Sequence, residues 1–224
     1  MNSFNQAIDF VLKNKSVNGI GTLKEKTVHA VLKKYYEPDE SSHEVKIGDY
    51  VADIVGEDGI IEIQSKSFYL MQKKLKNFLQ VANVTIVYPV YAKKIICASS
   101  SRISPKKERP LNIFTELYSI KNFINCNNLH FKIAVLEINE YRDNKGNKLD
   151  RVPTKLIKEI DLYSANSLLE LIPAELPKHF TSSDIAKICK VSKNHAFTII
   201  SVLKEVALIK KIGKDGRYDL YEKC

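Results

Sequence analysis

Residues 43 to 66 constrain the fold most, because three short runs of alternating apolar and polar residues follow one another there with tight turns between them. The runs are HEVKI, YVADIV and IIEIQSK, and the last two are separated by the turn GEDG at 56–59. Alternation with period two is typical of strands that are buried on one face. We therefore expect a three-stranded antiparallel meander, in which Glu62, Gln64 and Lys66 point to one face of the last strand and the isoleucines between them point to the other.

Helical patterns lie on both sides of this meander. Apolar residues recur there at helical spacing, and the second helix is expected to end before Pro38, because the residue before a proline is disfavoured in helical geometry. The apolar run VTIVYPVY is typical of a buried strand that is entered through a crossover helix. The expected helices are residues 4–14, 23–36, 69–79 and 114–124, and the expected further strands are 84–91 and 131–138. This order predicts an α/β fold, a mixed-sheet sandwich with helices on its faces.

The last quarter of the chain has a different pattern. Residues 141–152 are polar and turn-rich, helical patterning returns from 156 to 171, and two prolines then follow at 173 and 177. We expect a first domain of residues 1–172 and a second of residues 173–224. The second contains a helix from about Thr181 or Ser182, a turn at 190–192, a second helix from Lys193 and a hairpin around Asp215-Gly216. This arrangement resembles a winged helix-turn-helix, in which the second helix enters the major groove of DNA.

Composition narrows the partners and the location. The chain has 224 residues and a net charge of +9, from 35 Lys and Arg against 26 Asp and Glu, which favours a polyanionic partner. The four cysteines show neither CxxC spacing nor pairing with histidine, which argues against a zinc site and a disulfide framework. The first residues resemble neither a signal peptide nor a membrane span. We expect a cytoplasmic protein that has no membrane partner.

Asp53 and Glu62 are the candidate catalytic carboxylates. Metal-dependent hydrolysis of a phosphodiester needs acidic oxygens to hold the cation and a nearby polar or cationic group to position the nucleophile. The two residues lie on neighbouring strands of the predicted hairpin. They share a face only if the turn sets the right register, and an acidic residue on a strand is otherwise a solvated surface position.

These residues resemble the signature of the PD-(D/E)xK nuclease superfamily. The superfamily has an Asp on one strand and an acidic-x-Lys on the next, and this chain has Asp53 followed by Glu62-Ile63-Gln64. Gln64 stands where the lysine is expected, so the resemblance makes Lys66 the replacement candidate. It also implies that Glu25, on the preceding helix, binds a second metal or orients water, unless it only caps that helix. His29 lies one helical turn after Glu25 and is a candidate to assist it in catalysis.

The resemblance implies a restriction-endonuclease type of core and a Mg²⁺ or Mn²⁺ cofactor, held by Asp53, Glu62 and Glu25. The wider order of HAVLKKYYEPD, the meander, SPKK and the terminal winged helix also resembles a bacterial family of uncharacterised proteins. That likeness covers nearly the whole chain and implies no substrate.

Two basic regions are candidate DNA contacts. Between residues 93 and 109, six basic residues and one acidic residue give a local charge of +5, which suits backbone phosphates. A solvated loop has the same composition. The residues expected to contact nucleic acid are Lys93, Lys94, Arg102, Lys106, Lys107 and Arg109 in this region, Lys193, Asn194, His195 and Thr198 in the second helix of the C-terminal domain, and Lys210, Lys211, Lys214 and Arg217 in its hairpin.

The sequence thus predicts a metal-dependent DNA endonuclease that a winged helix recruits to DNA. A nuclease fold that has lost catalysis and only binds or regulates DNA is the alternative, because of the glutamine at position 64. A third possibility is an interaction protein whose winged helix pairs subunits, and a homodimer is compatible with any of these functions. The chain contains no GxxxxGK[ST] segment, which argues against nucleotide-driven translocation.

Overall fold

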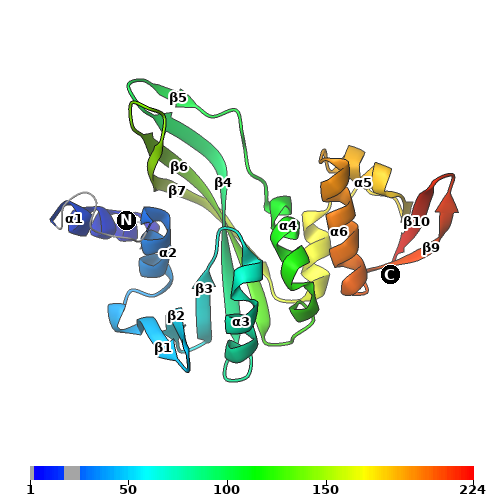
Figure 1. Ribbon diagram of the computed structural model, residues 1–224, viewed down its shortest axis with the longest axis horizontal. Coiled ribbons are helices and arrows are strands. Elements are labelled where there is room, and N and C mark those ends of the chain that lie inside the picture. Colours follow the sequence, from blue (N-terminus) through cyan, green and yellow to red (C-terminus); the bar gives the residue numbers. More distant parts are fainter. Residues whose placement is uncertain (1–2, 18–25) are drawn as a thin grey trace.

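The protein has a mixed α+β architecture built on one large sheet (Figure 1). The computed structural model describes residues 3–17 and 26–224. Seven strands form the sheet, in the order β1-β2-β3-β4-β6-β7, with β5 paired to β4. Glu25, one of the predicted metal ligands, lies outside the described residues. Within those ranges, no helix combines the length and the apolar character needed to cross a membrane.

The predicted meander is present. Strands β1 (His43–Ile47), β2 (Tyr50–Gly56) and β3 (Gly59–Ile63) pair antiparallel in sequence order. Gly59 has a φ of +122°, and a Cβ there would lie 2.4 Å from the carbonyl oxygen of Asn83, so the turn requires glycine. The structure corrects one detail, because β3 ends at Ile63 and the expected strand through Lys66 does not form.

The centre of the sheet is parallel. After β3, the short helices η2 (Phe68–Met71) and α3 (Gln72–Phe78) cross over to β4 (Val84–Cys97), which runs parallel to both β3 and β6 (Leu129–Arg142). The backbone N–H of Gln64 donates to the carbonyl of Val87, which draws the end of β3 toward β4. Strand β4 continues beyond residue 91 to Cys97, and the short strand β5 (Ser101–Ile103) folds back on it.

Strand β7 (Lys148–Leu162) corrects the expectation of helical structure from residue 156. Its residues pair antiparallel with β6 along nearly the whole strand, and the helical segment η5 (Ala165–Leu171) begins only afterwards. A long partner strand overrides a local helical pattern, because strand preference depends on packing against neighbours. Pro153 is tolerated because β7 is an edge strand with a register shift beside that residue.

Helices cover both faces of the sheet (Figure 1). Helices α1 (Ser3–Val17) and α2 (Thr27–Tyr36) bury one set of strand side chains, including Val87, Tyr91 and Leu136. On the other face, α3, η3 (Pro110–Asn112), α4 (Ile113–Leu117) and η4 (Tyr118–Phe123) cover a core that includes Ile86 and Val90.

The C-terminal elements follow the predicted order. They are β8 (His179–Phe180), α5 (Ser182–Ile188), α6 (Lys193–Glu205), β9 (Ile209–Asp215) and β10 (Tyr218–Lys223). Thr181 caps α5 and Ser192 caps α6, each through a side-chain oxygen that accepts a backbone N–H. Helix α6 packs against α4 and η4, and one continuous apolar cluster joins these elements. The boundary at residues 172 and 173 stays a prediction.

Candidate active site

Asp53 and Glu62 face each other across the β2–β3 hairpin. The ladder pairs Ile54 with Ile61, and Asp53 and Glu62 occupy the next step beyond that pair. Their carboxylates hold this step together, because the N–H of Asp53 donates to Oε1 of Glu62 at 3.1 Å and the N–H of Ile63 donates to Oδ2 of Asp53 at 2.8 Å. The register that the sequence left open therefore brings the two acids together.

His29 and Lys74 complete the cluster from the two helical layers. On one side, Nε2 of His29 in α2 lies 3.1 Å from Oδ2 of Asp53. On the other side, Nζ of Lys74 in α3 lies 2.6 Å from Oε2 of Glu62. Each acid thus has one basic partner from a helix, and the acids contact each other through the backbone.

Lys74 was not among the residues that the sequence predicted for this site. A signal was available, since the neighbours of Lys74 at i−3 and i+4 are Met71 and Phe78, both apolar and both buried. A lysine between two buried apolar positions on one helix face needs an acidic or polar partner. Here that partner is Glu62.

The two predicted replacements for the family lysine lie elsewhere. Gln64 follows the end of β3, and its Nε2 donates to the carbonyl of Lys66 at 2.7 Å. Lys66 is exposed at a bend and lines a neighbouring cavity. Glu62 forms its ion pair with Lys74, so the expected strand-face partnership of Glu62 with Lys66 is wrong.

The two carboxyl groups have opposite pKa shifts. Burial of Glu62, which is 5% exposed, and the nearby charge of Asp53 raise its pKa to about 7, against the opposing effect of Lys74. Burial also acts to raise the pKa of Asp53, but the hydrogen bond and charge of His29 and the N–H of Ile63 outweigh it, so that this pKa is lowered. Near neutral pH the pair shares less than two full negative charges, which is typical of carboxylates crowded into one site.

The donor set suits a hard divalent cation. Mg²⁺ and Mn²⁺ prefer carboxylate oxygens and keep several water or phosphate ligands, so one or two protein carboxylates are sufficient. Asp53 and Glu62 are such a pair. In the part of the chain that the structure describes, no group of three or more His, Cys, Asp or Glu side chains is placed to hold a metal ion.

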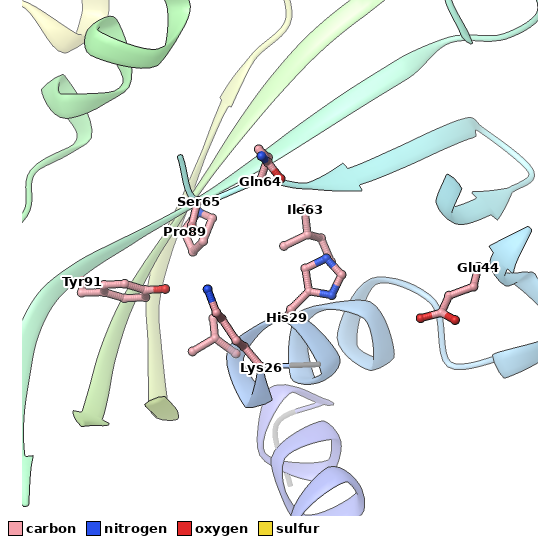
Figure 2. A pocket seen from close by; sticks show the side chains of 9 residues that line it. Lys26, His29, Glu44, Ile63, Gln64, Ser65, Pro89 and Tyr91 are labelled. Atoms are coloured by element: carbon pink, nitrogen blue, oxygen red, sulfur yellow. The ribbon is translucent and has the colours of Figure 1, made fainter. Parts of the chain in front are cut away.

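A cavity of about 430 Å³ lies beside this cluster. In Figure 2, Lys26 and His29 extend from the start of α2 toward Gln64 and Tyr91 on the sheet. Ser65 and Pro89 close the wall between them. His29 therefore connects the buried acids to a space open to solvent.

The basic residues predicted between 93 and 109 have different surroundings. Lys93 pairs with Glu137 at 3.3 Å and Lys94 with Glu140 at 3.6 Å, so acids on β6 partly neutralise both. Arg109 donates to the carbonyls of Cys189 at 2.8 Å and Lys190 at 3.0 Å, and thus contacts the turn before α6. Of the remaining residues, Arg102 and Lys107 are exposed and Lys106 lines a cavity.

Of the four residues of α6 that were predicted to contact DNA, two are exposed and two are partly buried. Lys193 and Asn194 are exposed, whereas His195 is partly buried beside Leu111 and Arg109. Burial lowers the pKa of His195, and the charge of Arg109 acts in the same direction. The hydroxyl of Thr198 donates to the carbonyl of Asn194, so it is engaged in its own helix.

In the C-terminal hairpin, half of the predicted contacts are paired with acids. Lys210 lies 3.1 Å from Glu222 and Lys211 lies 2.7 Å from Asp219. Lys214 and Arg217 are exposed near the hairpin turn, where Arg217 donates to the hydroxyl of Tyr218. The basic residues at the tip of the hairpin are therefore freer to bind phosphates than Lys210 and Lys211 are.

Comparison with known proteins finds a relative that aligns along most of both chains. A protein from Treponema pallidum (strain Nichols), described as "Uncharacterized protein", is 26% identical over 221 residues, which covers 91% of this chain and 87% of that protein. No solved structure matches. Residues 26–171 match the family described as Domain of unknown function (DUF8091), a range that contains Asp53, Glu62 and Lys74. Because this match spans more than half of the chain, the protein belongs to the DUF8091 family.

Proposed function

We propose that this protein is a metal-dependent DNA endonuclease with a core of the PD-(D/E)xK type. The observation that carries the proposal is the buried cluster in which Asp53 and Glu62 oppose each other on adjacent strands and Lys74 lies 2.6 Å from Glu62. Two acids and a lysine are the groups that this chemistry requires, and here the lysine comes from α3. The antiparallel meander followed by a parallel strand agrees with that fold type.

Each residue has a distinct role in the proposal. Asp53 and Glu62 supply the oxygens that bind Mg²⁺ or Mn²⁺, and the bound metal supplies a more acidic water and charge stabilisation at the phosphate. Lys74 favours the ionised form of Glu62 and provides a positive charge beside the reacting group. His29 orients Asp53 and keeps its pKa low.

The C-terminal unit is proposed to be a winged helix that recruits DNA. Its order of two helices and a hairpin supports this, as do the exposed Lys193, Asn194, Lys214 and Arg217. Helix α6 packs against α4 and η4, and the predicted contacts that are exposed and have no acidic partner lie in its first turn and at the hairpin tip. We expect these residues to bind phosphates more than base edges.

A nuclease fold without catalysis is the second candidate. It is favoured by Gln64 at the position where the PD-(D/E)xK resemblance implies lysine, and by the protein donors that already engage both carboxylates. In that case the winged helix would carry the function, either by binding DNA or by pairing two copies of the chain.

The test is incubation of wild type and Asp53→Ala with supercoiled plasmid, linear duplex and single-stranded DNA in Mn²⁺, Mg²⁺ or EDTA. Asp49→Ala is the matched control, since Asp49 is an exposed aspartate at a turn of the same meander. Metal-dependent cutting by wild type and Asp49→Ala, lost in Asp53→Ala, supports the enzyme. Equal binding by all three proteins without any cutting supports the non-catalytic alternative.

A further inference from the structure

A second cavity continues the one beside the acid cluster. It has a volume of about 470 Å³ and shares Lys26, Val28, Ser65 and Tyr91 with the first. The two together form a cleft that runs from His29 past the start of α2 to the first residues of β7, next to the β6–β7 turn. We call the second part the basic cleft, because its walls include Lys26, Lys66, Lys106, Lys148 and Arg151.

The acidic residues of the basic cleft are already engaged by the protein. Glu108 accepts the N–H of Tyr91 and Glu116 accepts the N–H of Phe68, both at 3.2 Å. Asp150 lies 3.0 Å from Nζ of Lys15. In contrast, no acidic side chain of the described chain lies within ion-pair distance of Lys66 or Lys106. Five basic side chains against three acidic ones leave this wall with a charge of +2.

Arg151 is held in a fixed position on this wall. Its Nε donates to Glu140 at 3.0 Å, and its guanidinium lies 4.8 Å from the ring centre of Tyr91. Glu140 is fully buried, and Lys94, Arg142 and Lys148 also lie within 4 Å of it. Burial acts to raise the pKa of Glu140, but the hydrogen bonds from Arg142 and Arg151 hold it at about 2. One carboxylate among four basic groups leaves a local charge of +3.

Tyrosine rings form the apolar part of the cleft. Tyr88 and Tyr91 line it, and each is only 6% exposed, so they form a rigid floor. Burial raises the pKa of both hydroxyl groups, which therefore stay neutral and can donate or accept hydrogen bonds. A positively charged groove that follows the backbone is typical of proteins that bind single-stranded nucleic acid. Because both rings are buried, the basic side chains rather than base stacking would hold the strand.

We propose that the basic cleft binds single-stranded DNA and leads one strand to the Asp53–Glu62 cluster. This inference rests on the proposed function and names the substrate of that site. Cavities of about 430 and 470 Å³ have the size of small-ligand sites, and a duplex, whose major groove alone is about 12 Å wide, is too bulky for them. In contrast, a cavity of about 1170 Å³ near the β2–β3 turn is lined by five acidic side chains and one lysine, which disfavours phosphates.

The test measures binding without catalysis. Fluorescence anisotropy in EDTA compares a labelled 12-nucleotide oligothymidine with a labelled 12-base-pair hairpin on the full chain. The variants are Lys66→Ala, Lys106→Ala and the double substitution, all at exposed positions. Lys158→Ala on β7 is the matched control, since Lys158 is exposed and lines neither cavity of the cleft.

We expect the double variant to bind the oligothymidine at least tenfold more weakly, with the salt slope of log K reduced by about 1.4, or about 0.7 for each lost phosphate contact. Lys158→Ala should bind as wild type does, and binding of the hairpin should change less than twofold in every variant. Unchanged binding of the oligothymidine, an equal loss for the hairpin, or no binding of single strands by wild type would each overturn the proposal.

The outcome is separable from that of the proposed function. Binding in EDTA requires neither metal nor cleavage. Loss of binding in the double variant together with no cleavage by wild type would support single-strand binding by the cleft and refute the nuclease function. Cleavage by wild type with normal binding in the double variant would support the nuclease function and refute single-strand binding by the cleft.

Discussion

Nζ of Lys74 lies 2.6 Å from Oε2 of Glu62, although the two residues come from α3 and β3. The crossover after β3 returns α3 along the sheet, which places this lysine beside the strand end that carries the acid. The positive charge that a strand lysine at position 64 would supply therefore comes from a helix. This placement makes Lys74, rather than Lys66, the lysine of the candidate site.

Substitution of Lys74 tests this assignment. We expect Lys74→Ala to lower the cleavage rate by at least about 100-fold, because the site loses its positive charge and Glu62 becomes harder to ionise. The free energy of unfolding should fall by about 2 kcal/mol or less, since Glu62 can take up a proton instead of remaining charged and unpaired. Cleavage assays and thermal melting measure both effects. Lys73→Ala, at an exposed position of the same helix, should match wild type, and an equal loss in both variants would contradict the assignment.

The raised pKa of Glu62 predicts a dependence of stability on pH. The folded protein binds the proton of the Glu62 carboxyl more tightly than the unfolded chain does. The resulting contribution to the free energy of unfolding is fully present below pH 4.5 and is lost as pH rises to about 7. In EDTA, the stability of wild type relative to Glu62→Gln should therefore decrease between pH 4.5 and 7. Urea unfolding at a series of pH values measures this difference. Parallel curves for the two proteins would show that Glu62 has an ordinary pKa.

The same shift predicts how metal binding depends on pH. A carboxylate must lose its proton to bind a cation, so the affinity for Mn²⁺ should increase about tenfold between pH 6 and pH 8. Calorimetric titration at the two pH values measures the change. Glu62→Gln should bind Mn²⁺ weakly at both, and an affinity that does not depend on pH would exclude Glu62 as a ligand with a raised pKa.

His29 is expected to act through Asp53. Removal of its hydrogen bond and charge in His29→Ala should raise the pKa of Asp53 toward its ordinary value. Titration of the Asp53 carboxyl by NMR in EDTA, from pH 2 to pH 7, measures this change. The cleavage rate at the optimum should fall by about tenfold. A lower rate with an unchanged pKa of Asp53 would mean that His29 only supports the fold.

Arg109 is predicted to hold the C-terminal unit on the core. Its guanidinium donates to the carbonyls of Cys189 and Lys190, so Arg109→Ala should leave both without these donors. The residue is exposed, and we expect a loss of about 1 kcal/mol in the free energy of unfolding. Hydrogen exchange should become faster at the α5–α6 turn. Lys107→Ala, exposed in the same segment, should leave exchange there unchanged, and slow exchange in both variants would refute the role.

Much of the fold could be predicted from the sequence, because the meander and the C-terminal elements carry local signals. Alternation, the GEDG turn and the caps at Thr181 and Ser192 act over a few residues, and the structure contains the predicted elements. Strand β7 could not be predicted in the same way, since its conformation depends on β6, which is distant in the sequence for most of the paired residues.

The candidate site could likewise be predicted only where it depends on local sequence. Asp53 and Glu62 were predictable because they occupy neighbouring strands of one hairpin, and only their register remained open. Lys74 was not found, because its contact with Glu62 depends on how α3 packs on the sheet. Lys66 was chosen by counting along a strand that ends at Ile63, and the N–H of Gln64 makes the last hydrogen bond of this segment to β4.

The initial rate of cleavage of end-labelled single-stranded DNA in Mn²⁺ decides whether Glu62 belongs to a nuclease site, with wild type and Glu62→Gln purified in parallel. This substitution keeps the shape of the side chain and removes its charge. We expect cleavage by wild type that stops in EDTA, and a rate at least about 100-fold lower for Glu62→Gln, with thermal stability maintained. Equal rates for the two proteins, or no cleavage by folded wild type, would refute the nuclease site.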